Sequence, residues 1–210
     1  MPGMAASSLI FENINLPSEH FEIHLLDWII PKNNESLCDY AKRLLTKVKH
    51  KNPILLGVSF GGILVQEMSK HIVCEKLIIV SSVKSKFELP KRMKFAKVTK
   101  AYKLMPTRLM SNIDLLAKYA FGNTITRRIE LYKKYLSMND KRYLDWAIMQ
   151  VVCWDQEKPI KETIHIHGEL DGVFPISNIK DCIVVKGGTH IMIVNKYKWF
   201  NENLPKLILN

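Results

Sequence analysis

Short apolar runs along the chain predict its strands. Continuous apolar runs at residues 53–58 and 76–82 have the pattern of strands that are buried on both faces. Residues 22–26 alternate polar and apolar side chains, which predicts a further strand, and residues 163–168 and 182–186 return to strand-like sequence.

Helical spacing of apolar residues fills most of the gaps between these strands. It predicts helices at residues 36–51, 61–71 and 191–204, and Pro205 disfavours continuation of the last one. Strands that alternate with helices indicate an α/β fold, in which a mostly parallel sheet carries helices on both faces.

A long helical segment interrupts this alternation after the strand at 76–82. Residues 84–159 are expected to form a lid of three to five helices, inserted into a core of residues 1–83 and 160–210. Residues 84–142 hold 16 Lys and Arg against four acidic residues, whereas the rest of the chain has a net charge of −1. Such a basic insertion indicates a local electrostatic role, and no module typical of nucleic-acid binding is present.

The run Gly57-Val58-Ser59-Phe60-Gly61 fits the pattern G-x-S-x-G between a buried strand and a helix. Glycines on both sides of Ser59 permit a turn so sharp that the serine projects above the sheet. The start of the following helix offers backbone N–H groups to a developing oxyanion. The bare pattern is a weak signal, because average composition gives it by chance in roughly several per cent of chains of this length. The strand–turn–helix context therefore carries the prediction of a nucleophile.

Two later segments supply an acid and a base for this serine, which is a poor nucleophile by itself. Asp171 lies in the turn after the strand at 163–168, and His190 lies in the loop after the strand at 182–186. The carboxyl ends of parallel strands share one edge of a sheet, so Ser59, Asp171 and His190 are expected to meet there.

With these motifs in the order Ser, Asp, His, the chain resembles the α/β-hydrolase family over nearly its whole length. The resemblance implies that Ser59 is the nucleophile, that Asp171 in H-G-x-x-D-x-x-x-P is the triad acid and that His190 in G-x-x-H is the base. It also implies an oxyanion hole made by the backbone N–H groups of Phe60 and Met4, and it requires neither a metal nor an organic cofactor.

The chain departs from the family at its N-terminal loop. In the family, a strand that would here precede Met1 feeds this loop, and its absence would leave a gap between the strands at 22–26 and 53–58. We favour a natural start upstream of Met1 over the alternative, in which two strands close the gap and the loop is misplaced. The 210-residue form is accordingly expected to be less stable or less active than one extended by an upstream strand.

Other side chains are weaker candidates for the site. Glu169 is an alternative acid, but it stands two residues before the tip of its turn, and Asp181 is expected to be a surface charge. His165 and His167 alternate on a strand and are expected in the core or at the sheet edge. The remaining histidines are expected at the surface: His20, His24, His50 and His71.

Large apolar side chains of the insertion have two interpretations. They either line an apolar acyl pocket or, more simply, form the core of the lid. The side chains concerned are Met105, Met110, Trp146, Met149 and Trp154.

Together these features predict a serine hydrolase that cleaves a carboxylic ester through an acyl-enzyme on Ser59. Because the lid is basic, a thioesterase acting on an anionic carrier, such as coenzyme A or an acyl-carrier protein, is an alternative; an anionic membrane surface is another partner for the same charge. A catalytically silent binding protein of the same fold is a third.

Composition limits the cellular setting. No apolar stretch approaches the roughly 18 residues of a transmembrane helix, and the start lacks the basic region of a secretory signal. Four scattered cysteines show no metal-ligand spacing, which favours free thiols in a reducing cytoplasm.

Overall fold

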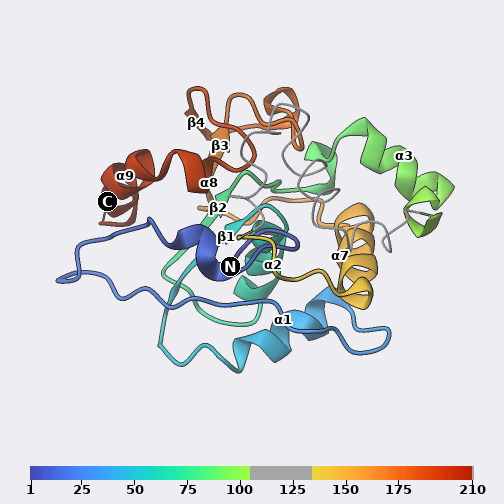
Figure 1. Cartoon of the computed structure of the whole chain (residues 1–210), viewed down its shortest axis with the longest axis horizontal. Coiled ribbons are helices and arrows are strands. Elements are labelled where there is room, and N and C mark those ends of the chain that lie inside the picture. The colour runs from blue at the N-terminus through green and yellow to red at the C-terminus, as the bar shows by residue number, and fades with distance from the viewer. Residues whose placement is uncertain (105–133, 210) are drawn as a thin grey trace.

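The computed structural model describes residues 1–104 and 134–209 (Figure 1). Within these ranges the sheet has four parallel strands, β1 (Ile54–Val58), β2 (Lys76–Val80), β3 (Ile164–Gly168) and β4 (Ile183–Val185), in that spatial order. Parallel strands need crossover connections, so all four carboxyl ends lie at one edge of the sheet. The predicted α/β fold with a mostly parallel sheet is confirmed.

The alternation of side chains along β1 and β2 divides the core into two layers. Leu55 and Leu77 pack in a cluster with α1 (Leu37–Leu45), α2 (Phe60–Ser69) and α7 (Lys141–Cys153).

On the other face, Ile54 and Ile78 pack in a second cluster with α8 (Met192–Asn195) and α9 (Tyr197–Leu209). Because successive strand residues point to opposite faces, the continuous apolar runs of the sequence serve both layers.

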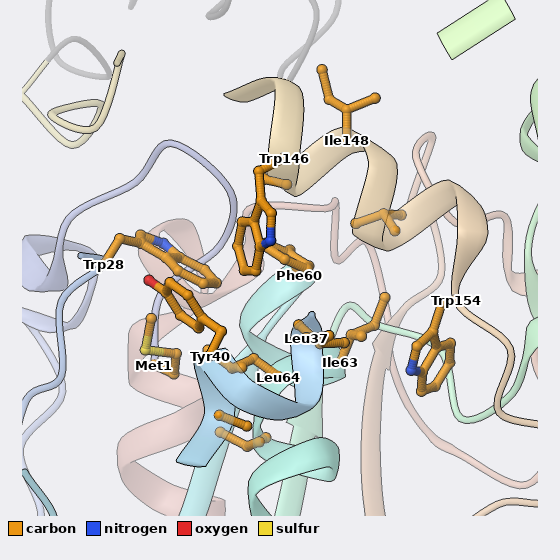
Figure 2. Close-up of a cluster of buried hydrophobic side chains, with 14 of the residues drawn as sticks. Met1, Trp28, Leu37, Tyr40, Phe60, Ile63, Leu64, Trp146, Ile148 and Trp154 are labelled. Carbon is orange, nitrogen blue, oxygen red and sulfur yellow. The ribbon is translucent and has the colours of Figure 1, made fainter. Parts of the chain in front are cut away.

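The first cluster contains an aromatic group drawn in Figure 2. The Trp28 and Phe60 rings stack with centroids 4.9 Å apart, and the Tyr40 and Trp146 centroids lie 4.4 Å apart. Trp146 also donates a hydrogen bond of 2.7 Å to the backbone oxygen of Glu35. Trp146 is therefore core packing between α7 and the helices beneath it.

Two predicted helix ends are wrong. The helix predicted at 36–51 ends at Leu45, with its N-cap at Ser36, whose hydroxyl accepts from the Asp39 N–H. At the C-terminus the predicted single helix is two, and α9 continues through Pro205. Phe200, Leu204 and Ile208 recur every four residues on the buried side of α9, and this packing outweighs the hydrogen bond that proline cannot make.

The strand predicted at 22–26 is absent. These residues adopt no helix or strand, and Ile23 and Leu25 are about half exposed. Polar–apolar alternation describes an extended, half-buried segment equally well, and a strand additionally needs a partner for its backbone groups.

Met1 instead borders the outer edge of β1. Its amino group donates to the Leu56 carbonyl at 2.7 Å, and its carbonyl accepts from the Val58 N–H at 3.0 Å. Beyond this contact, the edge opens on a cavity of about 530 Å³, bordered in part by residues 20–26 and 47–56. Residues 22–26 therefore do not pair with β1 to close the gap, contrary to the less favoured of our two expectations.

Between β2 and β3, the described residues form η2 (Lys86–Glu88), α3 (Lys91–Thr99), η3 (Ala101–Leu104) and α7. Elsewhere there are two further short 3₁₀ helices, η1 (Ser8–Phe11) and η5 (Ile176–Asn178). Residues 105–133 of the expected insertion, with Met105 and Met110, lie outside the described ranges. No helix in the described part of the chain is long and apolar enough to span a bilayer.

Candidate active site

Ser59 occupies a strained turn between β1 and α2. Its backbone has φ 54° and ψ −120°, a conformation that is costly for a residue with a side chain. A Cβ on Gly57 would lie 2.2 Å from the Gly61 oxygen, and one on Gly61 would lie 2.3 Å from the Pro2 oxygen. Both glycines are therefore required by close backbone approach, and the turn holds Ser59 at the carboxyl edge of the sheet.

The loops after β3 and β4 are joined to each other by backbone hydrogen bonds. The N–H of Glu169 donates to Val185, and the N–H of Leu170 donates to Gly188. Within the first loop, one oxygen of Asp171 accepts from the N–H groups of Val173 and Phe174 at 2.8 and 2.9 Å. These bonds fix the buried Asp171 carboxylate next to the loop that carries His190.

Ser59, His190 and Asp171 form an unbroken line of hydrogen bonds. His190 Nε2 lies 2.8 Å from Ser59 Oγ, and His190 Nδ1 lies 2.9 and 3.1 Å from the two oxygens of Asp171. A carboxylate only accepts, so Nδ1 carries the ring proton and Nε2 is free to accept the serine proton.

The charge on Asp171 is held by its surroundings. Burial alone raises the pKa of this carboxyl, but electrostatic attraction to His190 and the hydrogen bonds from His190 and the Phe174 N–H outweigh burial, and the pKa lies below its usual value. The carboxylate is therefore ionised next to the imidazole at neutral pH.

Ser59 and His190 border a cavity of about 290 Å³. Its walls come from the N-terminal loop, α3, η3, α7 and α8, and they are mostly apolar. Among the described lining residues, Arg92 is the one Lys, Arg, Asp or Glu, and its guanidinium donates to the carbonyls of Gly172 and Val173. Trp146, Met149 and Trp154 do not line this cavity, so their acyl-pocket interpretation is wrong.

The N-terminal loop lies against Ser59. A Cβ on Gly3 would be 3.5 Å from the Ser59 Cβ, so the loop is not misplaced. The Gly3 carbonyl accepts from the Trp28 indole at 2.8 Å, and in a trans peptide the Met4 N–H then points the opposite way. Met4 and Phe60 both border the cavity, and neither N–H has a hydrogen-bond partner within the described ranges.

Trp28 was missed by sequence reasoning as a residue of the site. The sequence placed it just beyond an expected strand, and nothing in its local pattern indicates a contact with Gly3. A buried indole N–H usually has a hydrogen-bond acceptor, and this general rule is the one signal in the sequence that Trp28 makes such a bond. The rule does not identify the acceptor.

Two buried histidines extend the line of hydrogen bonds into the core. His167 Nε2 lies 2.8 Å from the Phe174 carbonyl and 3.5 Å from Asp171, and His167 Nδ1 lies 3.1 Å from His165 Nε2. Burial lowers the pKa of His165 to about 3 and also lowers the pKa of His167, so both rings are neutral. His167 therefore connects the strand to the turn that presents Asp171.

Replacing His167 with leucine is expected to lower the free energy of unfolding by about 2–4 kcal/mol. The Phe174 carbonyl and the His165 ring would lose their partner, and each buried polar group left unsatisfied costs about 1–3 kcal/mol. Chemical denaturation measures this loss, and His167→Gln, which keeps an N–H donor, is the matched control. Equal stability of His167→Leu and the unchanged protein would show that the contact is dispensable.

The other candidates for the acid and the base do not take part in the hydrogen bonds between Ser59, His190 and Asp171. Glu169 is exposed and accepts from the Gly187 N–H, and Asp181 is exposed with its carbonyl bound by Lys84. His165 and His167 are buried as expected, and the remaining four histidines are exposed.

Known proteins resemble this chain in structure alone. No family model and no curated protein matches the sequence. A hydrolase from Pseudomonas aeruginosa superposes with a TM-score of 0.69 at 15% identity, covering 99% of this chain and 88% of its own. An esterase from Rhodococcus sp. gives 0.61 at 15% identity, covering 100% and 89%.

The chain has the α/β-hydrolase fold. A bromoperoxidase from Bacillus anthracis is also similar, with a TM-score of 0.55 at 19% identity over 82% of this chain and 73% of its own. Neighbours with such different activities share a scaffold, so the function of this chain has to be argued from its own site.

Proposed function

We propose that this protein is a serine hydrolase that cleaves carboxylic esters. The observation that carries the proposal is the unbroken hydrogen-bonded line from Ser59 through His190 to Asp171 at the wall of an apolar cavity. The esterases among the structural neighbours support the same reaction class.

In the proposed reaction, His190 Nε2 accepts the proton of Ser59 as Oγ attacks the ester carbonyl. Asp171 holds the ring in the required tautomer and stabilises the imidazolium that forms. The N–H groups of Phe60 and Met4 donate to the oxyanion, and His190 then returns the proton to the leaving alcohol. Water repeats the sequence on the acyl-enzyme and releases the acid.

Shape and charge around the cavity suggest the substrate. The mostly apolar walls suit an acyl chain of modest length, and α3 and α7, which we assign to a lid at 84–159, form part of these walls. Helix α3 carries four basic residues and no acidic one beside the cavity, which favours an acyl thioester of an anionic carrier as the second candidate. Four free thiols favour a reducing, cytoplasmic setting.

Hydrolysis of p-nitrophenyl acetate, butyrate, octanoate and palmitate tests this assignment. We expect kcat/KM to rise by up to about fourfold per methylene while the chain fits the cavity, because each buried methylene contributes about 0.8 kcal/mol, and then to fall at palmitate. Acyl-coenzyme A substrates are compared at about 0.02 M and about 0.5 M salt.

The comparison of substrates separates the candidate functions. Faster thioester cleavage that collapses at high salt, with neutral esters unaffected, would favour the thioesterase. Failure to hydrolyse any ester or thioester, together with no reaction of Ser59 with a fluorophosphonate probe, would leave the non-catalytic binding protein.

A further inference from the structure

Three side chains that suit a transition-metal ion meet where α1 and α2 pack together, away from the cavity. Cys38 is the second residue of α1, Glu67 lies near the end of α2, and His71 stands two residues beyond that end. The thiol sulfur, a carboxylate oxygen and an imidazole nitrogen all lie within 4.8 Å of one another. We propose that Cys38, Glu67 and His71 bind a zinc ion.

The spacing of the donor atoms is close to that of a tetrahedral zinc site. Cys38 Sγ lies 3.3 Å from His71 Nε2. Zinc at about 2.3 Å from sulfur and about 2.05 Å from nitrogen would hold these two atoms about 3.6 Å apart. The sulfur–nitrogen distance therefore has to increase by only a few tenths of an ångström for the hydrogen-bonded pair to become a pair of ligands. Side-chain rotation is sufficient for this change.

Charge and ligand type also favour zinc. A thiolate and a carboxylate together balance the two positive charges of the ion, and the mixed sulfur, nitrogen and oxygen donors suit a borderline-soft metal. Lys70 occupies one oxygen of Glu67 at 2.6 Å. The Lys70 side chain is 40% exposed, so it turns into water at little cost when the ion takes its place.

The helices give this site more rigidity than a second candidate offers. Leu37 of α1 and Leu64 of α2 belong to the same buried cluster, which fixes the two helices against each other. One donor atom each of Glu22, His24 and His50 also lies within 4.8 Å of the other two, but all three residues are exposed and lie outside helices and strands. Preorganised ligands bind more tightly, because less conformational freedom is lost.

Cobalt(II) titration under oxygen-free, reducing conditions tests the proposal, since a thiolate ligand produces a cobalt charge-transfer band in the near ultraviolet. We expect the band in the unchanged protein and its removal by added zinc. Cys38→Ser should abolish the band, and Glu67→Gln and His71→Gln should each weaken cobalt binding by more than about tenfold. Cys74→Ser and His24→Gln are matched controls that should keep it.

Thermal unfolding provides an independent measurement. Zinc should raise the melting temperature of the unchanged protein and of the two controls but not that of Cys38→Ser, because only a native site shifts the equilibrium. Circular dichroism establishes that each variant is folded. No band in the unchanged protein, a band that persists in Cys38→Ser, or full affinity in both Glu67→Gln and His71→Gln would overturn the proposal.

The test of the zinc site does not depend on the proposed hydrolase activity. Ser59 stands before the first residue of α2 and Glu67 near its end, and a ten-residue helix is about 15 Å long. Zinc binding with no ester hydrolysis would overturn the hydrolase proposal alone, and hydrolysis with no metal binding would overturn the zinc site alone.

Discussion

Replacing Ser59 with alanine is expected to lower kcat for ester hydrolysis by at least about 10⁴-fold and to abolish labelling by a fluorophosphonate probe. The reason is that His190 then has no hydroxyl to deprotonate, although the His190–Asp171 hydrogen bond and the cavity remain. Rates with p-nitrophenyl butyrate and in-gel detection of the probe measure the two effects.

Ser69→Ala is the matched control for this experiment, because Ser69 is the last residue of the helix that follows Ser59 and its hydroxyl only donates to the Gln66 carbonyl. It should keep both labelling and rate. Undiminished labelling of Ser59→Ala would show that another residue reacts, and the proposed mechanism would then be wrong.

Replacing Gly57 with alanine is expected to lower the free energy of unfolding by about 3 kcal/mol or more. The new Cβ would lie 2.2 Å from the backbone oxygen of Gly61 and 2.7 Å from the Gly62 nitrogen, so the start of α2 must shift away from β1. Because Ser59 stands between these two elements, activity should fall together with stability. Chemical denaturation and ester hydrolysis measure the two losses.

Gly172→Ala is the control for the glycine experiment, because a Cβ at Gly172 meets nothing within 4 Å although its neighbour Asp171 belongs to the site. It should leave the free energy of unfolding within about 0.5 kcal/mol of the unchanged value. If Gly57→Ala is equally harmless, the close packing of the turn against α2 is not required.

Local sequence was sufficient wherever one element determines the chemistry. The apolar run before Ser59 and the glycines around it describe a buried strand and a sharp turn without reference to any distant residue. The same holds for Asp171 and His190, since the turn after a parallel strand lies at the active edge of the sheet whatever the rest of the chain does. The predicted fold and the meeting of the three side chains depended on these local rules.

Prediction failed where packing between distant segments overrides the local pattern. Residues 22–26 have strand-like alternation, but no partner strand is available to them in the described part of the chain. Pro205 is a helix breaker by local rules, yet the burial of Phe200, Leu204 and Ile208 keeps α9 continuous. Trp146 is a large apolar residue of the kind that lines pockets, but its ring extends from α7 and packs on the aromatic side chains of the core.

The sequence by itself determined the class of fold, the turn at Ser59 and the predicted partners of that serine, Asp171 and His190, because short-range geometry and the shared edge of parallel strands require nothing more. Only the tertiary structure decided that Trp28 orients the Gly3–Met4 peptide, that His165 and His167 support Asp171, and that Cys38 meets His71. Each of these contacts joins segments whose separation is set by how helices, loops and strands pack together, and no local pattern of residues encodes that distance.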